Sequence, residues 1–110
     1  MNNPPAIDIH AHYYPESYIR LTEKHGSEFG ASVEYPKPDH PIIRSAPTVA
    51  VLEPRFIDLD ERIADMDRTG VDVHALSMTM PMIIWAGDEL RRKLVEAHND
   101  ASAEAHEKHP

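Results

Sequence analysis

The sequence predicts an α/β fold in which short parallel strands alternate with amphipathic helices. Two apolar, β-branched segments, Ala6–His10 and Val71–Met78, have the composition of buried strands. Helical patterns follow both segments, and a further one precedes the second. Strands separated by helices in this way pair in parallel through right-handed crossovers.

The first predicted strand leads into two histidines that are one residue apart. Because side chains alternate along a strand, we expect Asp8, His10 and His12 to share one face and Ile7 and Ile9 to share the other. Two imidazoles at this spacing can bind one metal ion, and active sites of α/β folds gather where strands open into loops. The H-x-H pattern alone is weak, since two surface histidines also produce it. It makes His10 and His12 candidate metal ligands.

The segment that follows predicts a helix and then a small hairpin. Pro15 suits a first helical position and Gly26 suits the residue after the end, which predicts a helix over Pro15–Gly26 with Tyr18, Leu21 and Ile19 facing inward. Ser27–Pro41 has a loop composition with extended pieces such as Ser32–Tyr35. Ile42–Arg44 and Thr48–Leu52 are short β-branched runs separated by Ser-Ala-Pro, which indicates a hairpin.

The second half predicts two helices. The first is Asp58–Gly70, where Asp58 can cap, Glu61 completes a capping-box spacing, and one face is apolar through Leu59, Ile63 and Met66. Met80–Ala86 is an apolar loop. A long helix then runs from Asp88 to about His106, and its apolar side consists of Leu90, Leu94, Ala97, Ala101 and Ala105.

Two parallel strands are too few to form a stable sheet, because parallel sheets bury both faces and contain several strands. We therefore expect residues 1–110 to be a single partial domain, the opening portion of a larger α/β domain, with a hairpin-containing insertion at about 27–56. The alternative is a small sheet completed by oligomerisation or by the hairpin strands.

Composition narrows the classes of function. The chain has 110 residues, no cysteine and a formal net charge of −8. The lack of a basic stripe argues against nucleic acid as a partner. Thiolate zinc sites are excluded, so a metal would need nitrogen and oxygen ligands. No secretory signal and no apolar stretch long enough to cross a membrane is present, so a cytoplasmic protein without a membrane partner is the default expectation.

Several motifs resemble those of a known family. I-D-I-H-A-H-x-x-P at Ile7–Pro15 is similar to the first-strand motif of the amidohydrolase superfamily of metal-dependent (β/α)8-barrel enzymes. D-x-D-E-R-I-x-x-M-D at Asp58–Asp67 resembles one branch, the amidohydrolase-related family that contains aminocarboxymuconate semialdehyde decarboxylase. Further matching segments follow in the expected order: Thr69–Val73, Ala75–Ser77, Trp85–Ala86 and His98–Asp100.

This resemblance implies the N-terminal part of a (β/α)8 TIM barrel, with two barrel strands and the hairpin as an insertion. It implies that His10 and His12 bind a divalent metal, with zinc as the expected ion, and that the remaining ligands and the catalytic residues lie beyond Pro110. The full-length parent would be a metal-dependent decarboxylase (a C–C lyase) or hydrolase that acts on a small unsaturated or aromatic carboxylate through metal-activated water. No substrate-binding residue can be assigned.

Two histidines do not complete a catalytic zinc site, which normally has three protein ligands and an open position. Activity of this chain alone is therefore left open. The alternative function is a catalytically incompetent truncated barrel that acts as a folded or self-associating module, with a homo-oligomer as its consequence.

Other polar residues have structural interpretations that we prefer. Asp8 could support the metal-binding imidazoles, but a carboxylate bonded to neighbouring polar groups is favoured. His74, in mid-strand, is expected to be a satisfied, half-buried histidine. Trp85 is expected to pack. The resemblance implies that an arginine of the hairpin region binds a substrate carboxylate, and it assigns this role to neither Arg44 nor Arg55. The histidines expected to be solvated are His25, His40, His98, His106 and His109.

Overall fold

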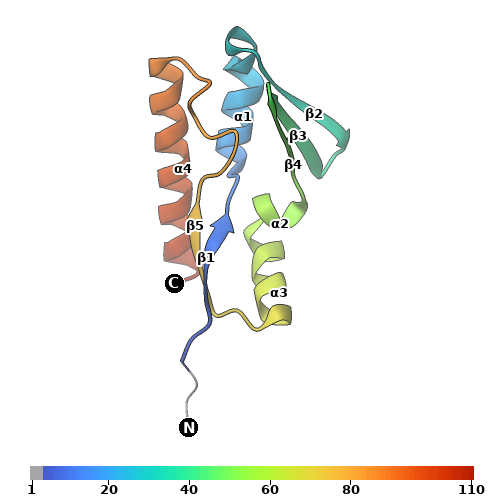
Figure 1. Cartoon of the computed structure of the whole chain (residues 1–110). Coiled ribbons are helices and arrows are strands. Elements are labelled where there is room, and N and C mark those ends of the chain that lie inside the picture. The colour runs from blue at the N-terminus through green and yellow to red at the C-terminus, as the bar shows by residue number, and fades with distance from the viewer. Residues whose placement is uncertain (1–3) are drawn as a thin grey trace.

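The computed structural model describes residues 4–110, which form a mixed α/β arrangement with one parallel and one antiparallel sheet (Figure 1). The parallel sheet consists of β1 (Ile7–His12) and β5 (Val73–Ser77). The antiparallel sheet consists of β2 (Ala31–Lys37), β3 (His40–Ser45) and β4 (Thr48–Val51). The helices are α1 (Glu16–His25), the 3-10 helix η1 (Gly26–Phe29), α2 (Pro54–Ile57), α3 (Leu59–Thr69) and α4 (Asp88–Lys108).

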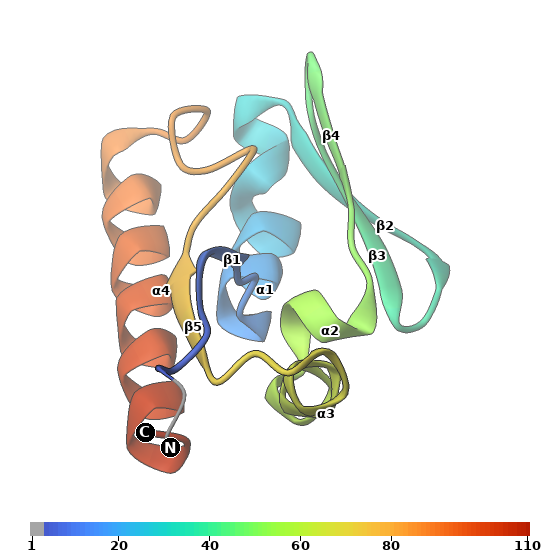
Figure 2. The ribbon, with the colours of Figure 1, turned by 60° about the horizontal axis from the view of Figure 1, so that its bottom comes forward.

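The predicted parallel pairing of the two strands is confirmed. Ile7 is opposite Val73 at one end of the sheet, and His12 is opposite Ser77 at the other. The first strand extends two residues beyond the predicted end at His10, because pairing continues and the Tyr13 amide still donates to the Ser77 carbonyl at 2.9 Å. Figure 2 shows both strands between α4 on one side and α3 on the other. Residues 4–110 thus form part of an α/β arrangement and do not close a barrel.

The hairpin lies where the sequence predicts it. Ser45 is opposite Thr48 and Ile42 is opposite Val51 across β3 and β4. The segment expected to be mostly loop contributes a third strand, since β2 pairs with β3 from Ala31–Ser45 to Lys37–His40.

The helix boundaries agree closely with those predicted from the sequence, although Gly26 and Asp58 do not end and cap their helices in the predicted way. Gly26 is right-handed, with φ −66°, and begins η1 where the backbone passes close to Ala31. Asp58 caps α3, but its side chain accepts from the Asp60 amide, while its own amide already donates to the Pro54 carbonyl. The predicted capping box with Glu61 therefore does not form. Gly70 ends α3 in the left-handed conformation, with φ 77°.

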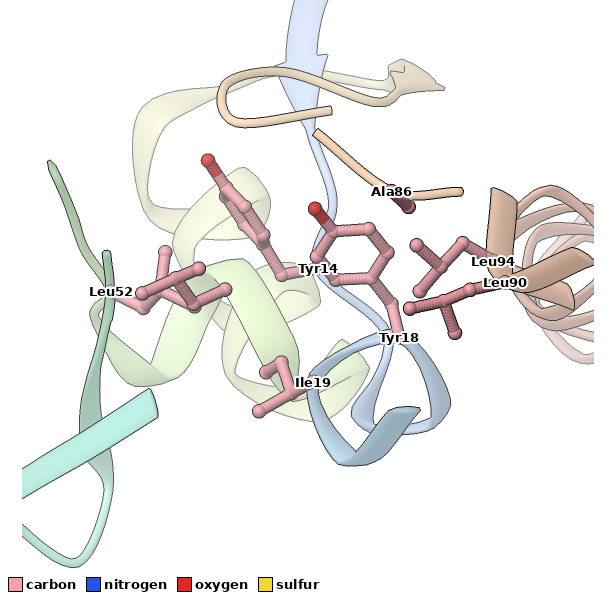
Figure 3. Close-up of a cluster of buried hydrophobic side chains, with 8 residues drawn as sticks. Tyr14, Tyr18, Ile19, Leu52, Ala86, Leu90 and Leu94 are labelled. Atoms are coloured by element: carbon pink, nitrogen blue, oxygen red, sulfur yellow. The ribbon is translucent and has the colours of Figure 1, made fainter. Parts of the chain in front are cut away.

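The hydrophobic core lies beyond the carboxyl ends of the parallel strands. It is formed where α1, α4, the antiparallel sheet and the loop after β5 meet, and Figure 3 shows most of its side chains. Tyr14 and Tyr18 stack edge to face, with ring centroids 6.2 Å apart. The cluster consists of Tyr14, Tyr18, Ile19, Ile43, Leu52, Ala86, Leu90 and Leu94.

The two core tyrosines also hold the loop after β5. The Tyr14 hydroxyl donates to the Met80 carbonyl and the Tyr18 hydroxyl to the Met82 carbonyl, each at 2.5 Å. Burial raises the pKa of Tyr14 to about 12 and that of Tyr18 still further, so both phenols remain donors at neutral pH.

The parallel sheet, in contrast, has an open face. Val73, Ala75 and Ser77 alternate along β5 and so share this face, and Val73 and Ala75 are exposed. Ile7, opposite Val73, is also exposed, and the neighbouring Ile9 is 69% exposed. Apolar side chains at these levels of exposure on a strand pair indicate a surface that further strands or another chain would cover.

A helix that spans a bilayer needs about 20 predominantly apolar residues. Between residues 4 and 110, no helix meets that requirement.

Candidate functional site

The two candidate ligands lie at the carboxyl end of β1. The ring centroids of His10 and His12 are 6.4 Å apart, and the rings are inclined at 74°. His10 is exposed and His12 is half-buried. The Nδ1 atom of His12 lies 3.0 Å from the Ser77 hydroxyl on the neighbouring strand, so Nε2 is the ring nitrogen outside this contact. The end of β1 therefore presents both imidazoles at the edge where α/β folds place ligands.

Asp8 does not share the face of His12, so that part of the predicted alternation is wrong. The register shifts between Asp8 and Ala11, which places Asp8 beside His74 and His12 beside Ser77. The side chains of His74 and Ser77 point to opposite faces of β5, because side chains alternate along a strand and these residues are three positions apart. The Asp8 carboxylate accepts from the His10 amide at 2.9 Å and lies 3.8 Å from Nε2 of His74. This agrees with the structural interpretation of Asp8.

His74 is the satisfied, half-buried histidine that the sequence predicts. Its Nδ1 accepts from the Arg62 guanidinium at 3.1 Å. Burial and the Arg62 charge both lower the pKa of His74, and Asp8 acts in the opposite direction. The imidazole is therefore neutral at neutral pH, as acceptance of the Arg62 hydrogen bond requires.

Arg62 is the residue through which α3 holds the end of β1. It belongs to the Asp58–Asp67 motif, which assigns it no role. It is 6% exposed and donates to the His12 carbonyl at 2.5 Å. Its guanidinium also lies 5.7 Å from the centre of the Tyr13 ring, a cation–π geometry. The spacing was the available signal, since Arg62 follows Leu59 by three residues and precedes Met66 by four and so lies on the apolar face of α3. The burial of Arg62 was not predicted because arginine side chains are usually exposed.

His98 is buried, and the prediction that it is solvated is wrong. It is 6% exposed, and its Nε2 donates to the Tyr13 carbonyl at 3.1 Å. Its ring meets that of Tyr13 edge-on at 6.0 Å. The four-residue spacing from Leu90 through Leu94 to His98 was the signal that could have identified it. Of the other histidines expected to be solvated, His106 and His109 are exposed, while His25 and His40 are half-buried.

Burial lowers the pKa of His98 below its ordinary value of 6.5, and the hydrogen bond to Tyr13 only partly offsets this. The folded state then binds fewer protons than the unfolded state below about pH 6.5. The contribution of His98 to the free energy of unfolding should therefore be constant above that pH and fall as the pH is lowered toward the folded-state pKa. Urea titrations across this range measure the effect.

The substitution His98→Gln should reduce this slope, because glutamine can donate to the Tyr13 carbonyl without titrating. His74 contributes a slope of the same sign, so His74→Gln is the matched comparison. Equal slopes in the wild type and in both variants would contradict the assignment.

A cavity of about 370 Å³ lies beside these groups, between β1, β5 and α3. Its lining includes Asp8, His10, His12, Arg62, Asp65 and His74. Arg55 also reaches this cavity, but its guanidinium is within 3.0 Å of Glu53 and 3.8 Å of Asp65. Arg44 is paired with Glu34 at 3.0 Å on the antiparallel sheet and is not among the residues that line this cavity. Trp85 packs against the core cluster, in line with its predicted role.

The donor set fits part of a metal site. Two imidazoles from one strand end are suitable nitrogen ligands for a divalent transition metal. Among the described residues, no group of three or more histidine or carboxylate side chains lies close enough to hold an ion. His10 and His12 can therefore supply two ligands, and a closed coordination sphere needs ligands from outside this set.

The fold and the histidine pair define an α/β unit with two potential nitrogen ligands at the end of β1. No protein-family model matches the chain. Over 83 residues, or 73% of the chain, it is 32% identical to 2-amino-3-carboxymuconate-6-semialdehyde decarboxylase of Caenorhabditis elegans. The matched region is 20% of that protein, so the chain spans about a fifth of the curated relative. The similarity supports the resemblance to the amidohydrolase superfamily.

Proposed function

We propose that this chain is the first part of a (β/α)8-barrel, metal-dependent enzyme in which His10 and His12 bind a divalent ion, with zinc as the expected metal. The observation that carries the proposal is the pair of imidazoles at the carboxyl end of a parallel strand. The position agrees with the rule that barrel enzymes place their sites at the carboxyl ends of the strands.

The open face of the parallel sheet supports the barrel. His12 and Ser77 lie at one end of this face, and the exposed Ile7 and Val73 lie at the other. In a closed barrel this face would line the interior. Apolar side chains would pack toward the amino ends of the strands, and the metal ligands would lie at the carboxyl ends. Further strands beside β1 and β5 would bury the isoleucines and supply the missing metal ligands.

The reaction we propose is decarboxylation of a small unsaturated or aromatic carboxylate, with hydrolysis as the less favoured reaction. The relative's name describes a decarboxylase, which favours the first. A bound divalent ion would supply a Lewis acid that activates water at neutral pH. The chain's own contribution is to fix the end of β1 and to orient the His12 imidazole: Arg62 and His98 hold the carbonyls of His12 and Tyr13, and Ser77 contacts the His12 ring.

The second candidate is a self-associating module without catalysis, and the exposed apolar face favours it. Ile7, Ile9 and Val73 would then be buried against another copy, with the free strand edge as the pairing surface. Size-exclusion chromatography separates the two proposals, because a module of this kind elutes as an oligomer whose formation depends on Ile9.

A zinc titration followed by NMR of the histidine side chains tests the metal site. We expect Zn²⁺ to shift the His10 and His12 ring resonances first and together. The double substitution His10→Ala/His12→Ala should weaken zinc binding more than about tenfold, because loss of a ligand costs at least as much as loss of its supporting group.

The matched control is His106→Ala/His109→Ala, which removes two exposed histidines at the end of α4. This variant should bind zinc as the wild type does. Zinc shifts centred on His106 and His109, and unchanged binding after loss of His10 and His12, would refute the proposed site.

A further inference from the structure

The Ser77 hydroxyl is the side-chain partner of the His12 ring. Its oxygen lies 3.0 Å from Nδ1 of His12, across the pair of residues that ends the parallel sheet. The contact joins residues 65 positions apart in the sequence, so it exists only when β1 and β5 are paired.

The backbone around this contact is fixed on both strands. The Tyr13 amide donates to the Ser77 carbonyl at 2.9 Å, which holds Ser77 beside the end of β1. On the other side, Arg62 holds the His12 carbonyl at 2.5 Å. Ser77 and His12 are both half-buried, which limits the competition of water for the His12 ring.

The hydroxyl can either donate to Nδ1 or accept from it, and the two cases have opposite consequences. A neutral imidazole has one N–H and one lone pair. If the hydroxyl donates, Nε2 carries the proton and has no lone pair for a metal. If the hydroxyl accepts, Nδ1 carries the proton and the lone pair of Nε2 is free. Nδ1 itself is occupied in both cases.

We infer that Ser77 is a positioning residue that accepts a hydrogen bond from Nδ1–H of His12 and so fixes the tautomer whose Nε2 can bind a metal. The inference rests on the proposed function, because the metal is what would use the free Nε2. Hydrogen-bonded partners of this kind set the tautomer and the orientation of metal-binding histidines generally. Neither the motif match nor the relative assigns a role to this serine.

The test uses the whole chain with nitrogen-15-labelled histidine, at a pH where the imidazoles are neutral. The nitrogen shifts of His12 report its tautomer without metal, and the same samples are then titrated with Zn²⁺. In the wild type we expect the proton on Nδ1. The substitution Ser77→Ala should move the population toward the Nε2–H tautomer, which histidine favours in water, and weaken zinc binding about tenfold.

Two further variants make the result specific. Ser77→Thr retains a hydroxyl and should preserve both the tautomer and the zinc affinity. Ser102→Ala is the matched control, because the Ser102 hydroxyl lies 3.4 Å from Nδ1 of a different histidine, His98. It should leave His12 unchanged. Thermal melting of each variant checks that the fold persists.

A wild-type His12 with its proton on Nε2 would overturn the inference, as would Ser77→Ala with an unchanged tautomer or an unchanged zinc affinity. Failure of the proposed function is a different result. It would be seen in the wild type itself, as zinc binding that does not involve His10 and His12 whatever residue stands at position 77.

Discussion

Replacing Leu94 by alanine should lower the free energy of unfolding by about 2–5 kcal/mol, the range for large-to-small substitutions in a packed core. Leu94 is 0% exposed and lies where α4 meets α1 in the core cluster (Figure 3). The loss combines the transfer free energy of the removed carbons with the cavity that remains. A chain of this size is marginally stable, so the change is a large fraction of the total.

Urea denaturation followed by far-ultraviolet circular dichroism measures this effect. The control is Ile84→Ala, which shortens an aliphatic side chain that is 77% exposed in the loop after β5. Its effect should stay within about 0.5 kcal/mol. Comparable losses for the two variants would mean that the cluster around Leu94 is not the stabilising core.

Replacing Arg62 by alanine should cost about 2–4 kcal/mol of stability. The variant loses charge-assisted hydrogen bonds to the His12 carbonyl and to His74, together with the contact with the Tyr13 ring. It also leaves a cavity between α3 and β1. Burial lowers the pKa of the Arg62 guanidinium, but arginine remains charged in proteins, so these bonds persist at all ordinary pH values.

Two further variants separate the contribution of the Arg62 hydrogen bonds from that of the volume its side chain fills. Arg62→Met fills the volume without hydrogen bonds and should recover about half of the loss, since a buried charge also carries a desolvation cost. Arg68→Ala removes an exposed arginine of the same helix, whose partner is Asp65, and should have little effect. If Arg62→Ala were no less stable than Arg68→Ala, α3 would not hold the end of β1.

The regular elements could be predicted from the sequence because their signals are local. The ends of α3 and α4 follow from Asp58, Gly70 and the start of the apolar pattern at Leu90. The parallel pairing of β1 with β5 follows from the alternation of strands and helices. The third strand, β2, was predicted only as an extended piece at Ser32–Tyr35, because Ser27–Pro41 contains glycine and prolines and the pairing of β2 depends on β3.

The histidine pair could be found as a motif, whereas the groups around it could not. Asp8 was assigned to the wrong face because ideal alternation contains no register shift, and the shift near Ala11 arises from pairing with β5. Arg62, Ser77 and His98 contact the end of β1 across 50, 65 and 85 residues of sequence. Contacts of that separation depend on tertiary packing, which periodicity does not encode.

Tyr14 and Tyr18 hold the loop after β5 by donating hydrogen bonds to its main-chain carbonyls. This kind of anchoring affects which residues of the loop can vary in evolution. Main-chain acceptors are the same for every amino acid, so Tyr14 and Tyr18 fix the path of the loop without specifying its side chains. The side chains of Met80 and Ile84 are exposed. Substitutions at these two positions can accumulate while the anchoring is preserved, so the rim above the strand ends can diversify independently of the scaffold that supports it.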